Sequence, residues 1–225
     1  MRHRQAMEAK PRSRFDLPQV IPVFPLAGAL LLPRGRLPLI IFEPRYLAMV
    51  DQALRTTRVI GMIQPSGGDA LRPNLFPVGC VGHLTSWSET GDGRFLITLT
   101  GAARFLVEAE LECTTPYRQV QANYKSFPHD FEDDDSGGID RVRLASSLKC
   151  YLKQQAIDVD WMSIERAPAE VLINSLAMIC PFDVAEKQGL LEAPTLCARA
   201  RMLTALIEMA AAATGGAPSG GETLQ

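Results

Sequence analysis

Cysteine pairs at metal-binding spacing are missing from this chain of 225 residues. The five cysteines stand far apart, at Cys80, Cys113, Cys150, Cys180 and Cys197. A zinc site built on the CxxC spacing, and with it a RING-type array, is therefore excluded. Because free cysteine is often a small core residue and most of these neighbours are apolar, we expect buried, reduced thiols.

Long apolar runs are missing as well. No run reaches the roughly 18–20 residues that cross a bilayer, and the first 20 residues hold basic side chains but no apolar stretch typical of a secretory signal. We therefore expect a cytoplasmic protein without a membrane partner.

The common catalytic and nucleotide-binding motifs do not occur. The chain contains no GxxxxGK[ST], GxGxxG, HExxH or GxSxG. Its three histidines, His3, His83 and His129, are too dispersed to form a local metal cluster, and the acidic run at 130–135 lacks the alternating ligands of an EF-hand loop. We expect no catalytic residue, no metal and no cofactor.

An excess of positive charge is also absent. The formal net charge is −2, and residues 1–14 alone carry +4, which leaves −6 for the remainder. Nucleic-acid binding needs clustered Lys and Arg. The composition therefore argues against a nucleic-acid partner, although an RNA-binding module stays open as an alternative.

What the sequence does contain is a β-rich portion followed by a helical one. Short apolar runs separated by Gly, Pro and Asp, among them Gly91-Asp92-Gly93, predict a small barrel or sandwich over 18–127 with one helix starting at Pro44. We expect Gly101 to break one of these strands.

Three segments separate or flank these two portions. Residues 128–138, with acidic side chains that include Asp130, predict a solvated flexible linker, and 139–213 predict helices. We expect a disordered basic tail over 1–17 and a second tail over 214–225. The fold class is α+β.

Local signals mark several of the expected helices. Asp183 and Glu186 have the spacing of a capping box, and Thr195 is placed to cap the last helix. In the first helix after the linker, Val142 is expected on the same apolar face as Leu148.

The stretch IIFEPRYLAMV, residues 40–50, places charges at the end of an apolar run. Glu43 precedes Pro44, where a negative charge favours the free N–H groups of a helix start. Its partner is Arg45 or a distant arginine. We interpret the group as a polar latch that fixes the helix on the barrel.

Several short segments, in the same order along the chain, resemble the Lon N-terminal (substrate-binding) domain family. They are IPVFPL at 21–26, LIIFEPRY at 39–46, GCVG at 79–82, DGR at 92–94, GAARF at 101–105 and EKQGLLE at 186–192. The resemblance implies a PUA-like pseudo β-barrel with one inserted helix, followed by a C-terminal helical bundle. It also implies structural signature positions, which are Phe42, Glu43, Arg45, Tyr46, Gly79, Gly82, Gly101, Arg104 and Phe105.

The same resemblance implies a role in recognising unfolded polypeptide or a partner protein. A full Lon protease continues into ATPase and peptidase domains, which this sequence lacks, so we expect no enzymatic activity. A small hydrolase with an unrecognised site is a further alternative. If Glu43 is buried against Arg104, replacing Glu43 by Ala should cost about 3–5 kcal/mol.

Overall fold

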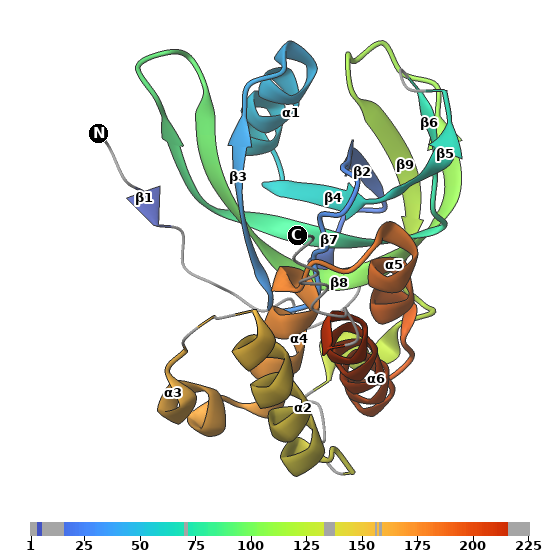
Figure 1. Cartoon of the computed structure of the whole chain (residues 1–225). Helices are drawn as coiled ribbons and strands as arrows, with labels where there is room; N and C mark the ends of the chain where they lie inside the picture. The colour runs from blue at the N-terminus through green and yellow to red at the C-terminus, as the bar shows by residue number, and fades with distance from the viewer. Residues whose placement is uncertain are drawn as a thin grey trace, which may run out of the picture.

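A closed β-barrel forms one end of the molecule (Figure 1). The computed structural model describes residues 4–5, 16–69, 72–132, 138–155, 157 and 159–215. Its larger sheet has the order β1-β7-β4-β2-β9-β8-β3, and an additional β7–β8 pairing closes the inner strands into a ring. The strands of this sheet are β1 (Arg4–Gln5), β2 (Val20–Pro25), β3 (Arg36–Ile41), β4 (Val59–Ile63), β7 (Val78–Glu89), β8 (Phe95–Leu111) and β9 (Arg118–Asn123).

The barrel pairs its strands antiparallel except for β2 and β4. A parallel pair needs a crossover connection, and helix α1 (Pro44–Arg55) lies in that crossover. The sequence predicts the helix and its start at Pro44, but not the crossover. Pro44 stands in the first turn of α1, where its missing N–H costs nothing. A small separate sheet pairs β5 (Pro65–Gly68) with β6 (Pro73–Leu75).

The expected break at Gly101 is wrong, because β8 runs without interruption from Phe95 to Leu111. Its second half belongs to the barrel, where it pairs with β9, whereas its first half pairs with β3. β3 stands at the end of the sheet order, so it is an edge strand.

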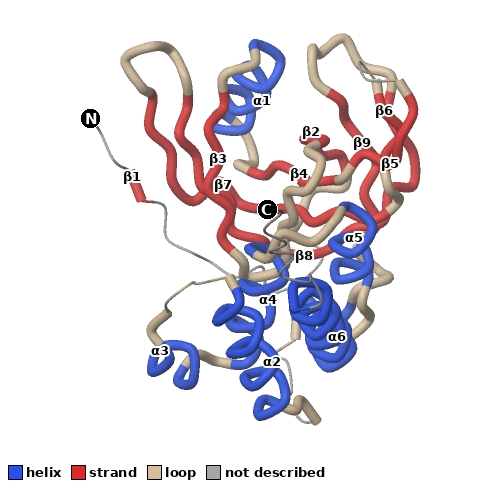
Figure 2. The backbone as a smooth tube through the Cα atoms, viewed as in Figure 1, coloured by secondary structure: helices blue, strands red, loops and turns tan. Residues whose placement is uncertain are grey.

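The remaining helices gather at the opposite end, below the sheet in Figure 2. They are η2 (Pro128–Phe131), a 3-10 turn, followed by α2 (Arg141–Gln154), α3 (Trp161–Arg166), α4 (Ala169–Ile179), α5 (Val184–Glu192) and α6 (Leu196–Gly215). The predicted capping box of Asp183 and Glu186 is present at the start of α5. The predicted cap of α6 is confirmed by the hydrogen bond from Ala198 N–H to Thr195 Oγ1, at 3.1 Å.

Two hydrophobic clusters fill the molecule. The smaller one lies inside the barrel around Phe105, and the larger one joins the barrel to the helices through buried leucines of both portions. The fold is therefore α+β, a pseudo β-barrel with an inserted helix and a helical portion packed on it.

Several expectations about single residues are corrected. Val142 is 78% exposed and does not share the buried face of Leu148. Leu17, placed in the N-terminal tail, is buried in the barrel, whereas residues 1–3, 6–15 and 216–225 of the two expected tails lie outside the described residues.

The expectation of buried thiols is correct for only two of the five cysteines. All five cysteines are free, and only Cys80 and Cys180 are buried.

Candidate functional site

The charged residue at the centre of the barrel–helix joint is Arg104. It lies on β8, and its side chain is only 2% exposed. Its guanidinium makes a bidentate pair with Asp130, whose carboxylate oxygen Oδ1 lies 2.7 Å from Arg104 Nη2. Asp130 also accepts the backbone N–H of Arg104, at 2.7 Å. On its other side, Arg104 Nη1 donates to the carbonyls of Leu191 and Ala193 at the end of α5.

This geometry contradicts two expectations. Arg104 does not pair with Glu43, and Asp130 does not belong to a solvated linker, because its side chain is 5% exposed and held by η2 against β8. A carboxylate taken from water needs a well-placed partner, and Arg104 supplies it. Residues 133–137 of the expected linker lie outside the described residues.

Glu43 instead pairs with its near neighbour Arg45. The Glu43 carboxylate accepts from Arg45 Nε at 2.9 Å, and both side chains remain more than 40% exposed. The Arg45 guanidinium lies over the Tyr46 ring, 4.5 Å from its centroid, and Tyr46 contacts Phe24 at 4.1 Å between ring centroids. The local alternative for the partner of Glu43 is therefore confirmed, but the pair is a surface one.

The glycines among the predicted signature residues meet across β7 and β8. Gly82 lies opposite Gly101, and Gly79 lies opposite Phe105. A Cβ on Gly101 would stand 2.0 Å from the Leu32 carbonyl oxygen, and one on Gly79 would stand 2.5 Å from Phe105 Cζ. These positions are glycine because a neighbouring backbone or ring occupies the space of a side chain. Phe42, by contrast, is 63% exposed just beyond β3.

A second polar network, which no local sequence pattern predicts, ties α5 to the barrel. Gln64 at the end of β4 donates to the Val184 carbonyl and to Gln188 Oε1, both at 3.1 Å. Gln188 donates in turn to the Val78 carbonyl. Lys187 reaches the Gly28 carbonyl at 2.6 Å, and burial lowers the pKa of this lysine.

Arg199 on α6 completes the polar interior. It donates to the Leu190 carbonyl and to Asn174 Oδ1, at 2.9 and 3.0 Å. Burial, and next the charge of Arg104, lower the pKa of Arg199 to about 10. Asn174 uses its amide N–H to bind the Pro33 carbonyl, so this chain of contacts runs from α6 through α4 to the loop before β3.

That loop forms one wall of a groove. Arg34, which has a φ of +63°, donates to Glu170 at the start of α4 and to the Glu132 carbonyl. Gly35 allows the loop to approach α4, since a Cβ there would stand 2.4 Å from Met178 Sδ. The contacts fix the beginning of β3 beside α4.

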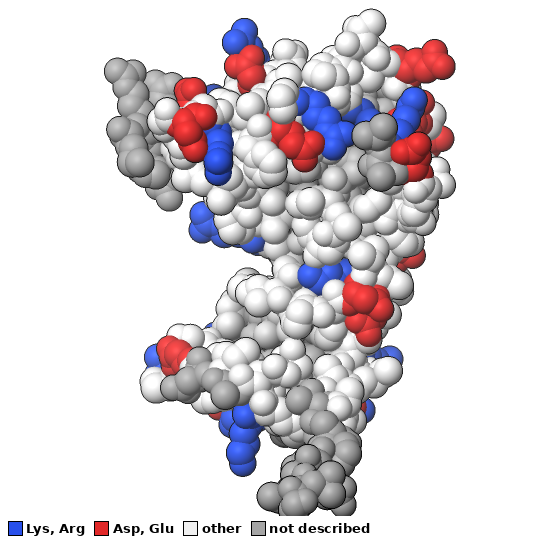
Figure 3. Space-filling model, turned by 45° about the horizontal axis from the view of Figure 1, so that its top comes forward, with Lys and Arg blue, Asp and Glu red and all other residues white. Residues whose placement is uncertain are grey.

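The groove has a volume of about 250 Å³ and lies between the barrel and the helices. Figure 3 shows the molecule indented between these two parts. Its apolar lining comes from β3 and α4, with Leu37, Pro38, Val171, Met178 and Ile179. Ile179 is 78% exposed and Val171 is 49% exposed.

An exposed apolar strip continues from the groove along β3. Ile40 follows Pro38 on the same face, because alternate residues of a strand share a face, and Phe42 follows Ile40. Leu96 of β8 lies directly opposite Ile40. Ile40 is 60% exposed and Leu96 is 42% exposed. Groove and strip together form one apolar path over the surface, which we call the β3–α4 path.

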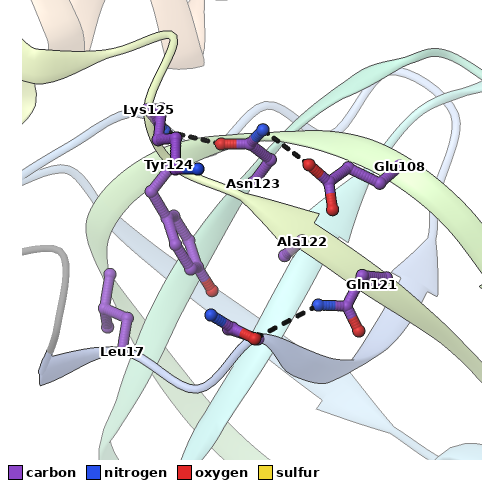
Figure 4. A pocket seen from close by; sticks show the side chains of 8 residues that line it. Leu17, Glu108, Gln121, Ala122, Asn123, Tyr124 and Lys125 are labelled. Carbon is purple, nitrogen blue, oxygen red and sulfur yellow. Dashed lines mark hydrogen bonds between the residues drawn. The ribbon is translucent and has the colours of Figure 1, made fainter.

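A different hollow, of about 280 Å³, lies beside β9 (Figure 4). Four of its polar side chains bond in pairs: Asn123 donates to Glu108 at 2.6 Å, and Gln121 donates to Gln19 at 3.4 Å. Tyr124 directs its hydroxyl to the Pro18 carbonyl. Because these groups already have partners, the hollow offers less to a ligand than the β3–α4 path.

Reactive groups are not assembled in the described part of the chain. No cluster of three metal-ligating side chains occurs among those residues. The Cys80 thiol is buried, which raises its pKa and keeps it from acting as a thiolate. Burial lowers the pKa of His83, so this strand histidine is neutral at pH 7. No described helix is both long and apolar enough to cross a bilayer.

Comparisons with solved structures identify the fold. A Lon N-terminal domain protein from Xanthomonas campestris matches with a TM-score of 0.55 at 20% identity, over 83% of this chain and 97% of that one. The N-terminal domain of the Mycobacterium avium complex Lon protease matches with a TM-score of 0.60 at 14% identity, over 84% and 97%. The expected fold is therefore confirmed.

Sequence comparisons agree. Lon protease 2 of Myxococcus xanthus is 26% identical over 85% of this chain, and Lon protease of Anaeromyxobacter dehalogenans is 27% identical over 85%. The chain spans about a quarter of the length of these relatives, 24% and 23%. The family model for the ATP-dependent protease La (LON) substrate-binding domain matches residues 20–209. The resemblance read from the sequence is thereby confirmed, and the chain belongs to the family of Lon substrate-binding domains.

Proposed function

We propose that this chain is a non-catalytic module that binds polypeptide, and that the β3–α4 path is its binding surface. The observation that carries the proposal is a groove of about 250 Å³ with an apolar lining, continued by exposed Ile40, Phe42 and Leu96. Membership of a family described as substrate-binding supports it.

Apolar surface of this kind suits a ligand of variable sequence. Burial of apolar area is non-directional, so an unfolded segment gains free energy without a fixed pattern of hydrogen bonds. Folded monomers rarely leave large apolar residues exposed side by side unless the patch binds something. The ligand class is therefore an extended segment rich in apolar side chains.

The backbone of β3 supports the same ligand class. Gly101 N–H donates to the Gly35 carbonyl at 2.8 Å, and the register pairs Leu37 with Leu99. Because antiparallel pairs alternate, the backbone groups of Pro38 and Ile40 face the open edge of the sheet. Pro38 has no N–H, so an added segment gains backbone hydrogen bonds mainly beside Ile40.

A charge placed in the groove tests the proposal. The probe is a fluorescently labelled protein kept unfolded by alkylation of its cysteines, and the readout is its anisotropy. Ile179→Glu should weaken binding by roughly fivefold to tenfold, because an exposed apolar contact worth about 1 kcal/mol or more is lost. Its thermal stability should stay the same, since Ile179 is 78% exposed.

Val142→Glu is the matched control. Val142 is equally exposed, at 78%, but lies on α2 and is not part of the groove lining. The proposal fails if both variants bind the unfolded probe as the wild type does, or if both weaken it equally.

A further inference from the structure

A second hollow, of about 130 Å³, lies at the barrel end away from the helices. It is bordered by the first turn of α1, the start of β9 and the β5–β6 hairpin, elements that Figure 1 labels at the upper end of the barrel. The polar residues that line it in the described part of the chain are two tyrosines and two arginines, Tyr46, Tyr117, Arg45 and Arg118.

The two tyrosine hydroxyls have no hydrogen-bond partner among the described residues. Tyr46 is 6% exposed and Tyr117 is 7% exposed, so both rings are almost fully buried. Within the described part of the chain, neither hydroxyl makes a hydrogen bond to another residue. Neither oxygen is sealed from solvent, because Arg199 Nη2 alone among described side-chain atoms is both buried and unpartnered. Both hydroxyls are therefore accessible to solvent, and both tyrosines line the hollow.

The arginines keep donors free as well. Arg45 binds Glu43 through Nε and Nη2, and its Nη1 has no hydrogen bond to any described residue. Arg118 binds Glu110 through Nε and Nη2, and the Pro73 carbonyl through Nη1. A guanidinium has five N–H groups, so Arg118 retains two.

Ion pairs border the hollow. Glu43 pairs with Arg45, and Glu110 pairs with both Arg118 and Arg72. Figure 3, with this end turned forward, shows side chains of both signs gathered there. Burial raises the pKa of both Tyr46 and Tyr117, so both phenols remain protonated donors at neutral pH.

The remaining walls are four prolines, Pro25, Pro65, Pro73 and Pro116. Proline rings supply apolar carbon surface and no backbone N–H. Among the residues that the structure describes, no carboxylate or amide side chain lines the hollow. The lining thus combines hydrogen-bond donors with hydrocarbon, which fits an acceptor group attached to an apolar stem.

We propose that this hollow binds a carboxylate, and that its ligand is the C-terminal residue of a polypeptide. Arginine and tyrosine N–H and O–H groups match carboxylate oxygens, and charge assistance makes such bonds strong. The volume is below that of a pocket for a drug-sized molecule, so it accepts an end group rather than a whole ligand. The choice of a polypeptide rests on the proposed function.

The test compares an acid with its amide. N-acetyl-phenylalanine is titrated into the isotopically labelled full chain, and backbone amide shifts are followed by NMR. Saturable changes should be confined to the first turn of α1 and the start of β9. N-acetyl-phenylalanine amide should bind at least tenfold more weakly, because it has lost the charge. Equal binding of acid and amide overturns the proposal.

Conservative variants separate this site from a general apolar effect. Tyr46→Phe and Tyr117→Phe remove hydroxyls that hold no hydrogen bond within the described residues, so both variants should fold. Each substitution should lower the affinity for N-acetyl-phenylalanine roughly tenfold. Tyr151→Phe on α2, a buried tyrosine outside the hollow, is the matched control. Unchanged affinity in a double Tyr46→Phe, Tyr117→Phe variant overturns the proposal.

A short peptide without Asp or Glu identifies the source of the carboxylate. With a free C-terminus it should bind at least as tightly as the acid, and its C-terminal amide should not bind. If only the free acid binds, the polypeptide ligand is refuted. Ile179→Glu should leave the affinity for N-acetyl-phenylalanine unchanged. If N-acetyl-phenylalanine does not bind but the unfolded probe protein still does, only the carboxylate site is refuted.

Discussion

Arg104 and Asp130 form the ion pair whose loss should cost the most at the scale of single residues. Asp130→Ala leaves the Arg104 guanidinium 2% exposed with only carbonyl partners. Breaking a buried pair from one side typically costs about 3–5 kcal/mol. We expect a loss of that order in the free energy of unfolding, measured by urea denaturation.

Glu43→Ala is the comparison for that experiment. The Glu43–Arg45 pair is more than 40% exposed, and such pairs contribute about 0–1 kcal/mol. We therefore expect Glu43→Ala to lower the free energy of unfolding only slightly. A large loss would be expected only if Glu43 were the buried partner of Arg104. Similar losses in the two variants would contradict the assignment of Asp130 as that partner.

At the scale of single residues, spacing along the sequence predicts the helix caps but not the Arg104–Asp130 pair. Caps involve residues three apart, so the Asp183–Glu186 box and the Thr195 cap were predictable from spacing. Asp130 and Arg104 are 26 residues apart, and a run of acidic residues is normally solvated. Only the approach of η2 to β8 distinguishes Asp130 from its neighbours, and no local pattern encodes that approach.

Strand β8 carries the most sensitive backbone position at the scale of elements. Gly101→Ala should destabilise the fold by about 3 kcal/mol or more, since its Cβ would stand 2.0 Å from the Leu32 carbonyl oxygen and backbone cannot yield easily. Gly91→Ala is the control, because a Cβ there meets nothing within 4 Å. Thermal melts of the two variants provide the measurement. Equal melting temperatures would show that β8 can shift away from Leu32.

Gly101 also shows why the sequence predicts a break in β8 that the structure does not have. Glycine in an apolar run usually weakens a strand, and this general tendency predicts the break. In the structure, the absence of a side chain at Gly101 instead lets the 32–35 loop cross β8 and reach α4. The groove depends on that crossing, and no local pattern in the sequence encodes it.

Helices α2 and α6 are joined by a pH-dependent contact. Hydrogen bonds from Arg143 and Ser147 lower the pKa of Glu208 to about 2. A depressed carboxyl pKa means that the stabilisation is complete above about pH 4.5 and is lost as pH falls toward 2.

Glu208→Gln tests this contact. The wild type should exceed the variant in free energy of unfolding by a constant amount above pH 4.5, and the difference should shrink below it. Urea titrations at a series of pH values measure it, and high salt should reduce it. A difference that grows on acidification would contradict the assignment.

The barrel and the helices share one hydrophobic core at the scale of the whole molecule. Leu30, Leu84 and Leu99 of the barrel portion and Leu190 and Leu203 of the helices belong to the same buried cluster. Arg104 and Gln64 send their hydrogen bonds across the same boundary. The groove of the proposed function lies on this boundary, so its geometry depends on both portions remaining together.

Joint burial predicts that the two portions unfold together. Calorimetry of the full chain should show a single transition, whereas a fragment of residues 16–127 should show no cooperative melting. Without the helices, the leucines around Leu84 and the buried charge of Arg104 are exposed on the fragment, and neither has a replacement partner. Two separate transitions, or a fragment that melts sharply and holds the chemical shifts of the full-length barrel, would show instead that the barrel is an independent unit and that the groove can open by separation of its walls.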